Sequence, residues 1–382
     1  MTNIKPFKID ILPTEIEDLK TRLTNVRWPD TEPVDDWSQG LPTQYHKDFC
    51  DYWANEYDWF ATQNHLNQFT QYVTNLDGLD IHFIHVKSSH ADAKPLLITH
   101  GWPGSIVEFH KVIEPLTEPT KHGGSIDDAC HVICPSLPGY GFSEKPSTPG
   151  WNVGRIAAAW DLLMSRLGYE NYYAQGGDWG AGVTTTIGMQ NLGRCKSIHV
   201  NLLTAGPTKE ALTNPSPADT IALERAQKFR ALGLGYHKQQ STRPQTIGYA
   251  LSDSPVGQSA WILEKFHQWT DCDGHPENIF SRDELIDNIM LYWLTNSGAS
   301  SARLYWETFN PEAKFSKPVP ITLPAGASLF PKEIMAGPRS WSEQLLVNIQ
   351  YWNEVDRGGH FAAFEQPEIF VEEMRNWLRA VG

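Results

Sequence analysis

The sequence predicts an α/β fold, in which helices cover both faces of a mostly parallel sheet. Short apolar runs without alternation, PLLIT at 95–99 and YYAQG at 172–176, are typical of strands buried on both sides. Helical patterns separate these runs, as they do in the β–α–β units of parallel sheets. The alternation stops near Gly206-Pro207 and resumes at PVPITLPAG, so a helical insertion interrupts the sheet.

These patterns divide the 382 residues into four segments. The core begins with two strands about an Asp77-Gly78 turn. Ligands of parallel sheets bind beyond the carboxyl ends of the strands, where the insertion would form a lid. The segments are an N-terminal wrapping segment at 1–68, the first part of the core at 69–206, the helical lid at 207–318 and the second part of the core at 319–382.

The wrapping segment is expected to pack on the rest of the chain. Thr14, with Glu17 three residues on, predicts the N-cap of a first helix. A second helical stretch runs from Thr43 to Thr62. A free linker would not carry the four tryptophans of this segment, which are Trp28, Trp37, Trp53 and Trp59.

Composition excludes several classes of protein. Lys and Arg number 31 against 45 Asp and Glu, and the formal net charge of −14 disfavours nucleic acid and anionic membranes as partners. The five cysteines form no C-x-x-C pair and no metal-ligand spacing, so we expect free thiols, a reducing compartment and no metal. No run of about 18 apolar residues occurs, which predicts a cytoplasmic protein without a membrane anchor.

The segment GGDWG, at 176–180, joins a predicted strand to a predicted helix. It has the form of the α/β-hydrolase nucleophile elbow, G-x-nucleophile-x-G, with Asp178 in place of serine. An Asp after two glycines is also a common helix N-cap, so this motif needs support from elsewhere. HGWPG follows the 95–99 strand, where such enzymes supply one N–H of an oxyanion hole. The backbone N–H groups of Trp102 and Trp179 are therefore the candidate donors.

A base and an acid complete the predicted constellation. His360, in RGGHF, follows the last predicted strand and precedes the last helix, where the hydrolase histidine falls. Glu333, in LFPKE, comes after a strand expected at 320–324 and would orient the imidazole. Asp356 is the alternative acid, although it lies close in sequence to His360. The order nucleophile, acid, base is that of the hydrolases.

An aspartate nucleophile favours displacement at saturated carbon. Its carboxylate is ionised at pH 7, attacks without a base and forms an alkyl ester. His360 would then deprotonate the water that hydrolyses this ester. An epoxide oxygen is a poor leaving group and needs an acid, which tyrosine hydroxyls could supply. The predicted lid contains several tyrosines, which are Tyr236, Tyr249, Tyr292 and Tyr305.

The chain resembles the microsomal-type epoxide hydrolases over nearly its whole length. The matching strings include RWPDT, HGWPGS, PSLPGYGFSEKP, GGDWG and RGGHFAAFEQPE. The resemblance implies hydrolysis of a small apolar epoxide by water without a cofactor, and it suggests a homodimer. By similarity, it assigns the nucleophile to Asp178, the base to His360 and the acid to Glu333. It assigns the ring-opening hydroxyls to Tyr236 and Tyr305 and the oxyanion amides to Trp102 and Trp179. Animal microsomal members begin with a hydrophobic anchor, so the chain is more similar to the soluble members.

Two other functions stay open at this point. A haloalkane dehalogenase shares the aspartate elbow and the fold, but it commonly carries Asn after the His-Gly, where this chain has Trp102. A binding module on a hydrolase scaffold would belong to a different class, and its function would survive substitution of the triad. The candidate tyrosine acids favour the epoxide hydrolase.

Overall fold

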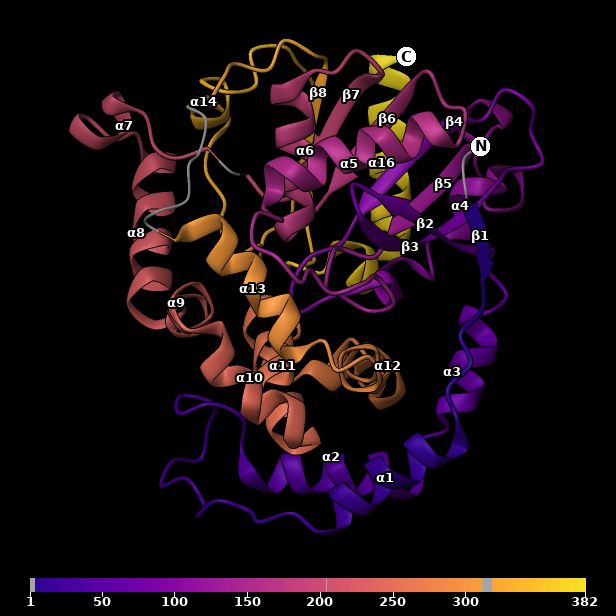
Figure 1. The fold of residues 1–382 in the computed structure, drawn as a ribbon. Coiled ribbons are helices and arrows are strands. Elements are labelled where there is room, and N and C mark those ends of the chain that lie inside the picture. Colours follow the sequence, from indigo (N-terminus) through magenta and orange to yellow (C-terminus); the bar gives the residue numbers. More distant parts are fainter. Residues whose placement is uncertain (1–3, 204, 311–317) are drawn as a thin grey trace.

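The computed structural model describes residues 4–203, 205–310 and 318–382. These residues form a nine-stranded sheet in the order β1-β2-β3-β5-β4-β6-β7-β8-β9 (Figure 1). The pairs from β5 to β9 are parallel, and the first three pairs are antiparallel, so the predicted mostly parallel sheet is confirmed. The strands are β1 Ile4–Phe7, β2 Gln71–Leu76, β3 Leu79–Val86, β4 Lys94–Thr99, β5 Cys130–Pro135, β6 Tyr172–Gly176, β7 Cys195–Val200, β8 Ala325–Leu329 and β9 Ile349–Glu354.

Helices cover both faces of the sheet. In Figure 1, α5 (Val153–Arg166) and α6 (Asp178–Gln190) lie in front of the strands and α16 (Pro367–Val381) lies behind them. The strands that the helices cover are almost wholly buried along β4, β6 and β7. The apolar residues that α16 buries recur at helical spacing, and they are Phe370, Val371, Met374, Trp377 and Leu378.

Between β7 and β8 the described residues are mostly helical. Figure 1 shows α10 to α13 between the sheet and the N-terminal helices, and α7 to α9 at the side of the molecule. The end of the predicted lid, at 311–317, lies outside the described residues. The helices are α7 Lys209–Thr213, α8 Pro217–Leu232, α9 Gly235–Thr242, α10 Pro244–Asp253, α11 Pro255–Trp269, α12 Arg282–Leu294 and α13 Gly298–Phe309.

The N-terminal residues pack on these helices. Trp53 Nε1 donates a hydrogen bond to Met290 Sδ at 3.3 Å, and Trp37 stacks on His267 with ring centroids 3.9 Å apart. In Figure 1 the chain starts with β1 at the edge of the sheet, passes below α10 to α12 and returns through α3 to β2, which pairs with β1. This edge strand is absent from the sequence-based interpretation. The helices of this N-terminal segment are α1 Pro13–Thr24, α2 Thr43–Asn55 and α3 Trp59–Leu66.

Two local predictions for this segment are wrong. Helix α1 begins at Pro13, because proline fixes a helical φ at the first position, so Thr14 lies inside the first turn. Glu15 rather than Glu17 closes that end, accepting a hydrogen bond from Leu12 N at 3.1 Å. The helical stretch expected from Thr43 to Thr62 is two helices, since the Asp58 side chain caps a new helix at Phe60 N.

The strand expected at 320–324 is also misplaced. Strand β8 begins at Ala325, and of the earlier residues Ile321 makes an isolated bridge to Leu346. Prolines at 318, 320 and 324 have no N–H for a strand ladder, which explains the later start. The acid still follows this strand, because Glu333 comes directly after β8 and a short turn.

Some expectations concern what the chain does not contain. The five cysteines are buried and free, so the prediction of unpaired thiols is confirmed. Within the described ranges, no helix has both the length and the apolarity that crossing a bilayer requires. The same residues hold no cluster of three or more His, Cys, Asp or Glu side chains arranged for a metal ion. Short helices α4 (Ile113–Thr117), α14 (Arg339–Ser342) and α15 (Ala362–Glu365) complete the fold.

Candidate active site

Asp178 occupies a strained turn between β6 and α6. Its φ is +47°, a left-handed conformation that few non-glycine residues adopt. A Cβ at Gly176 would lie 2.1 Å from Gly180 O, and one at Gly180 would lie 1.8 Å from Thr99 O. The glycines of the motif are therefore required for close backbone approach. Gly177, and not Asp178, is the N-cap of α6, so the aspartate side chain is free to face the site.

The loop after β4 binds one oxygen of this carboxylate. Trp102 N donates a hydrogen bond to Asp178 Oδ1 at 2.7 Å. A Cβ at Gly101 would lie 2.1 Å from the same oxygen, so only glycine fits there. Helix α12 holds the loop, because Tyr292 OH and Asn288 Nδ2 donate to the carbonyls of Gly104 and Pro103.

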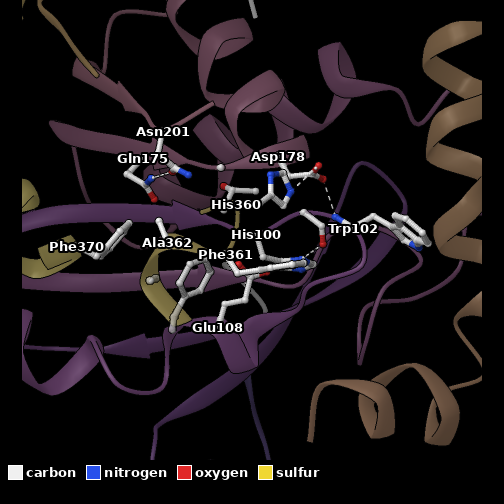
Figure 2. Close-up of a pocket in the computed structure, with 15 residues that line it drawn as sticks. His100, Trp102, Glu108, Gln175, Asp178, Asn201, His360, Phe361, Ala362 and Phe370 are labelled. Atoms are coloured by element: carbon white, nitrogen blue, oxygen red, sulfur yellow. Dashed lines mark hydrogen bonds and ion pairs between the residues drawn. The ribbon is translucent and has the colours of Figure 1, made fainter. Parts of the chain in front are cut away.

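His360 lies between the carboxylates of Glu333 and Asp178, and Figure 2 shows the side that faces Asp178. Its Nδ1 is 2.6 Å from Glu333 Oε1, and its Nε2 is 3.2 Å from Asp178 Oδ2. The Glu333 carboxylate also accepts a hydrogen bond from Ile334 N at 2.7 Å. Asp356, the alternative acid, is exposed to solvent. The structure therefore places Glu333 at the imidazole, and Asp356 away from it.

Residues outside the predicted set hold the His360 loop. His360 N donates to Trp269 O at 2.9 Å, and the Trp269 ring lies edge-on to the imidazole with centroids 4.9 Å apart. Phe361 N donates to Glu365 Oε1 at 2.8 Å. Glu365 stands within the string RGGHFAAFE and could have been found there as a buried acid close to the base. Trp269 carries no sequence signal of this kind.

The two carboxylates set the charge of His360. Burial lowers the pKa of its imidazole, but the negative charges of Glu333 and Asp178 raise it, and the net pKa lies well above the ordinary value. The resting site therefore holds an imidazolium between two acids at neutral pH. Removal of either negative charge would lower the pKa of His360.

Two tyrosines of the helical region face Asp178 across a cavity of about 490 Å³. Tyr236 belongs to α9 and Tyr305 to α13, and their ring centroids are 5.8 Å apart. Both rings pack on Trp102. Burial and then neighbouring negative charge raise the pKa of both phenols, so both hydroxyls carry protons. The rest of the lining is mostly apolar, with Trp179, Leu202, Ala226, Phe229, Leu234, Phe309, Ile334 and Met335.

The remaining candidates lie elsewhere or act differently. Tyr249 is 72% exposed, and Tyr292 hydrogen bonds to the oxyanion loop. Trp179 packs its ring edge on Tyr305 with centroids 4.7 Å apart. Among the described residues its backbone N–H makes no hydrogen bond to the Asp178 carboxylate, which leaves Trp102 as the observed donor.

Fold and site together define an α/β-hydrolase-type centre with a carboxylate at the nucleophile elbow. Two family profiles match the chain, "Epoxide hydrolase N terminus" over residues 4–109 and "alpha/beta hydrolase fold" over residues 94–367. The "Putative epoxide hydrolase" of Stigmatella aurantiaca is 53% identical over 98% of this chain and 85% of that protein. "Epoxide hydrolase 1" of Sus scrofa is 39% identical over 98% of this chain and 88% of its own length.

Solved structures agree with these relatives. The juvenile hormone epoxide hydrolase of the silkworm Bombyx mori superposes with a TM-score of 0.91 at 33% identity, covering 99% of this chain and 95% of that one. The Aspergillus niger epoxide hydrolase has a TM-score of 0.88 at 32% identity, covering 99% and 96%. The chain belongs to the epoxide hydrolase family of the α/β-hydrolase fold.

The charge of His360 should depend on Asp178. In an Asp178→Asn variant one neighbouring negative charge is lost, so we expect the pKa of His360 to fall while burial continues to lower it. NMR titration of ring-labelled histidine in both proteins measures this difference. Buried His82, whose pKa burial lowers to about 3, is the internal control and should not change. An equal His360 pKa in the two proteins would contradict the electrostatic account.

Proposed function

We propose that this epoxide hydrolase opens its substrate to a vicinal diol through an alkyl ester on Asp178. One observation carries the proposal: the Asp178 carboxylate contacts a backbone N–H and an imidazole and faces two buried phenols. The phenols suit a leaving oxygen that must gain a proton. Because a halide needs no such proton, the pair favours an epoxide over a haloalkane, in agreement with the relatives.

In the first half-reaction an oxygen of Asp178 attacks a ring carbon of the epoxide. The ring C–O bond breaks as the ester bond forms, and the ring oxygen takes a proton from Tyr236 or Tyr305, which becomes a tyrosinate. The second phenol donates a hydrogen bond to the same oxygen. The apolar cavity excludes bulk water and strengthens these hydrogen bonds.

Ester formation also prepares the second half-reaction. It removes the negative charge of Asp178, so the pKa of His360 falls. The imidazolium then gives its proton to the tyrosinate, and the neutral imidazole becomes able to accept a proton from water. Water then attacks the ester carbonyl carbon and gives a proton to His360 Nε2. Trp102 N–H stabilises the resulting oxyanion, with the Trp179 N–H as the proposed second donor.

The intermediate then collapses by breaking the bond between the carbonyl carbon and the alkyl oxygen. The leaving alkoxide takes the proton back from His360, so the diol is released neutral. The Asp178 carboxyl proton passes to His360, which restores the carboxylate, the imidazolium and so the starting state of the enzyme. Glu333, whose carboxylate holds Nδ1 at 2.6 Å, keeps the imidazole oriented throughout.

The proposal extends to the surroundings of the site. The segment at 207–318 would act as the lid, since its helices α9 and α13 supply the two phenols. The apolar lining supports a small apolar epoxide as substrate. The five free, buried thiols support a cytoplasmic location. A homodimer stays a prediction.

Removal of the base should separate the two half-reactions. In His360→Gln the ester still forms, because attack by the carboxylate needs no base, but its hydrolysis stops. Intact mass spectrometry after mixing with styrene oxide should show an alkyl adduct that accumulates to one per protein. The Asp178→Asn protein is the control and should stay unmodified. A His360→Gln protein that never forms an adduct would argue against the ester.

The tyrosines should affect the other half-reaction. Tyr236→Phe and Tyr305→Phe each remove one proton donor while keeping the ring contacts with Trp102. General acid catalysis contributes about 10²- to 10⁴-fold, so loss of one of two donors should slow ester formation at least about tenfold. Rapid-quench kinetics measures this rate, and Tyr249→Phe on the exposed surface is the matched control. Equal rates in all four proteins would exclude the phenols as acids.

A further inference from the structure

Asp178 separates two cavities of opposite character. On one side lies the apolar cavity of about 490 Å³ with the two phenols. On the other side lies a small chamber that offers about 20 Å³ to the centres of water molecules. Asp178 is the one described residue that lines both. Asp178 is therefore open to two different cavities, one mostly apolar and one partly polar.

The chamber has the size and lining of a site for one water molecule. A buried water needs about 10–15 Å³ and two to four polar partners. Gln175 is 1% exposed, its Nε2 donates to Asn201 Oδ1 at 2.8 Å, and its Oε1 has no hydrogen-bond partner among the described residues. His360 lines the same chamber, and Figure 2 shows it with Gln175 and Asn201 among the lining side chains.

Glu108 completes the polar lining. It belongs to the 3₁₀ turn Ile106–Phe109 that follows the oxyanion loop, and it is 9% exposed. A Cβ at Gly104 would lie 1.6 Å from Glu108 Oε1, so the carboxyl occupies space that only a glycine leaves open. Neither proposed half-reaction uses this buried acid.

The charge state of Glu108 suits a hydrogen-bonding role. Burial raises its pKa to about 8, with His360 lowering it and Asp178 raising it further. At neutral pH the carboxyl is therefore mostly protonated, and it can donate one hydrogen bond and accept another. A neutral acid also avoids repulsion with the nearby Asp178 carboxylate.

We propose that this chamber holds the water that hydrolyses the Asp178 ester, and that Glu108 and Gln175 hold and orient it. The inference rests on the proposed function and adds the place of the water and two residues to it. The water oxygen forms the new bond to the ester carbonyl carbon, and one of its protons passes to His360 Nε2. Gln175 Oε1 accepts a hydrogen bond from the other proton, while Glu108 donates to the water oxygen.

This arrangement separates water from the alkyl group. Water approaches from the chamber, opposite the apolar cavity, so the ester can be hydrolysed while the substrate cavity stays dry and occupied. The epoxide is then exposed to the carboxylate and the phenols but not to an activated water. Direct attack of water on the epoxide, which would bypass the ester, is thereby disfavoured.

Substitution of Glu108 tests the chamber. Glu108→Met keeps the length of the side chain but removes its hydrogen bonds, and Glu108→Gln keeps neutral hydrogen bonding. The loss of one hydrogen bond corresponds to about a tenfold effect, so Glu108→Met should slow ester hydrolysis at least about tenfold. Ester formation should keep its rate. Glu108→Gln should restore hydrolysis to within about threefold of the natural enzyme.

Rapid quench and intact mass spectrometry with styrene oxide measure both rates in one experiment. When hydrolysis limits turnover, kcat and KM should fall together in Glu108→Met and leave kcat/KM unchanged. Gln175→Met removes the opposite side of the chamber and should give the same selective loss. Asp287→Asn changes a partly buried carboxyl that lines neither cavity and should change neither rate.

Each outcome bears on a definite claim. Hydrolysis at the natural rate in Glu108→Met, an equal loss of both rates, or Glu108→Gln as slow as Glu108→Met would each overturn the water chamber. In the first of these cases the natural enzyme still forms an ester and a diol, so the proposed function survives. A natural enzyme that yields diol without any ester would instead overturn the proposed function itself.

Discussion

The site depends on one imidazole held between two buried carboxylates. Glu333 fixes one nitrogen of His360 at 2.6 Å, and Asp178 lies 3.2 Å from the other. Both carboxylates stabilise the imidazolium, so the ring cannot act as a base until Asp178 loses its charge. Ester formation removes that charge. The same contact therefore ties the start of the second half-reaction to the completion of the first.

The fold brings these groups together at the carboxyl ends of neighbouring strands. Asp178 follows β6, Glu333 follows β8 and His360 follows β9, while the oxyanion loop follows β4. The helical region adds the phenols from the opposite side, and the N-terminal residues pack against that region through contacts such as Trp53 with Met290. The chain thus places an apolar cavity over a polar, charged centre. The residues that line the cavity with the two phenols are mostly apolar, whereas the small chamber is lined in part by Glu108, Gln175 and His360.

Much of this arrangement could be predicted from the sequence, because a sharp elbow and an oxyanion loop need particular residues. The close contacts at Gly176 and Gly101 explain why the elbow and the oxyanion loop can be recognised in the sequence, because only glycine fits at these positions. The start of β8 and the N-cap of α1 differ from the sequence-based expectation, because proline effects override the apolar pattern and the Thr–Glu spacing. The surroundings of Glu108 could not be predicted, because the Gly104 space and the unpaired oxygen of Gln175 arise only from packing.

The covalent ester is the central claim, and a single turnover in water enriched in heavy oxygen tests it directly. With enzyme in excess over styrene oxide, the account predicts one heavy oxygen in the Asp178 carboxylate, located by peptide mass spectrometry. The first diol should carry none, because both of its oxygens come from the epoxide and from Asp178. A heavy oxygen in that diol, with an unlabelled Asp178, would show direct attack by water and contradict the account.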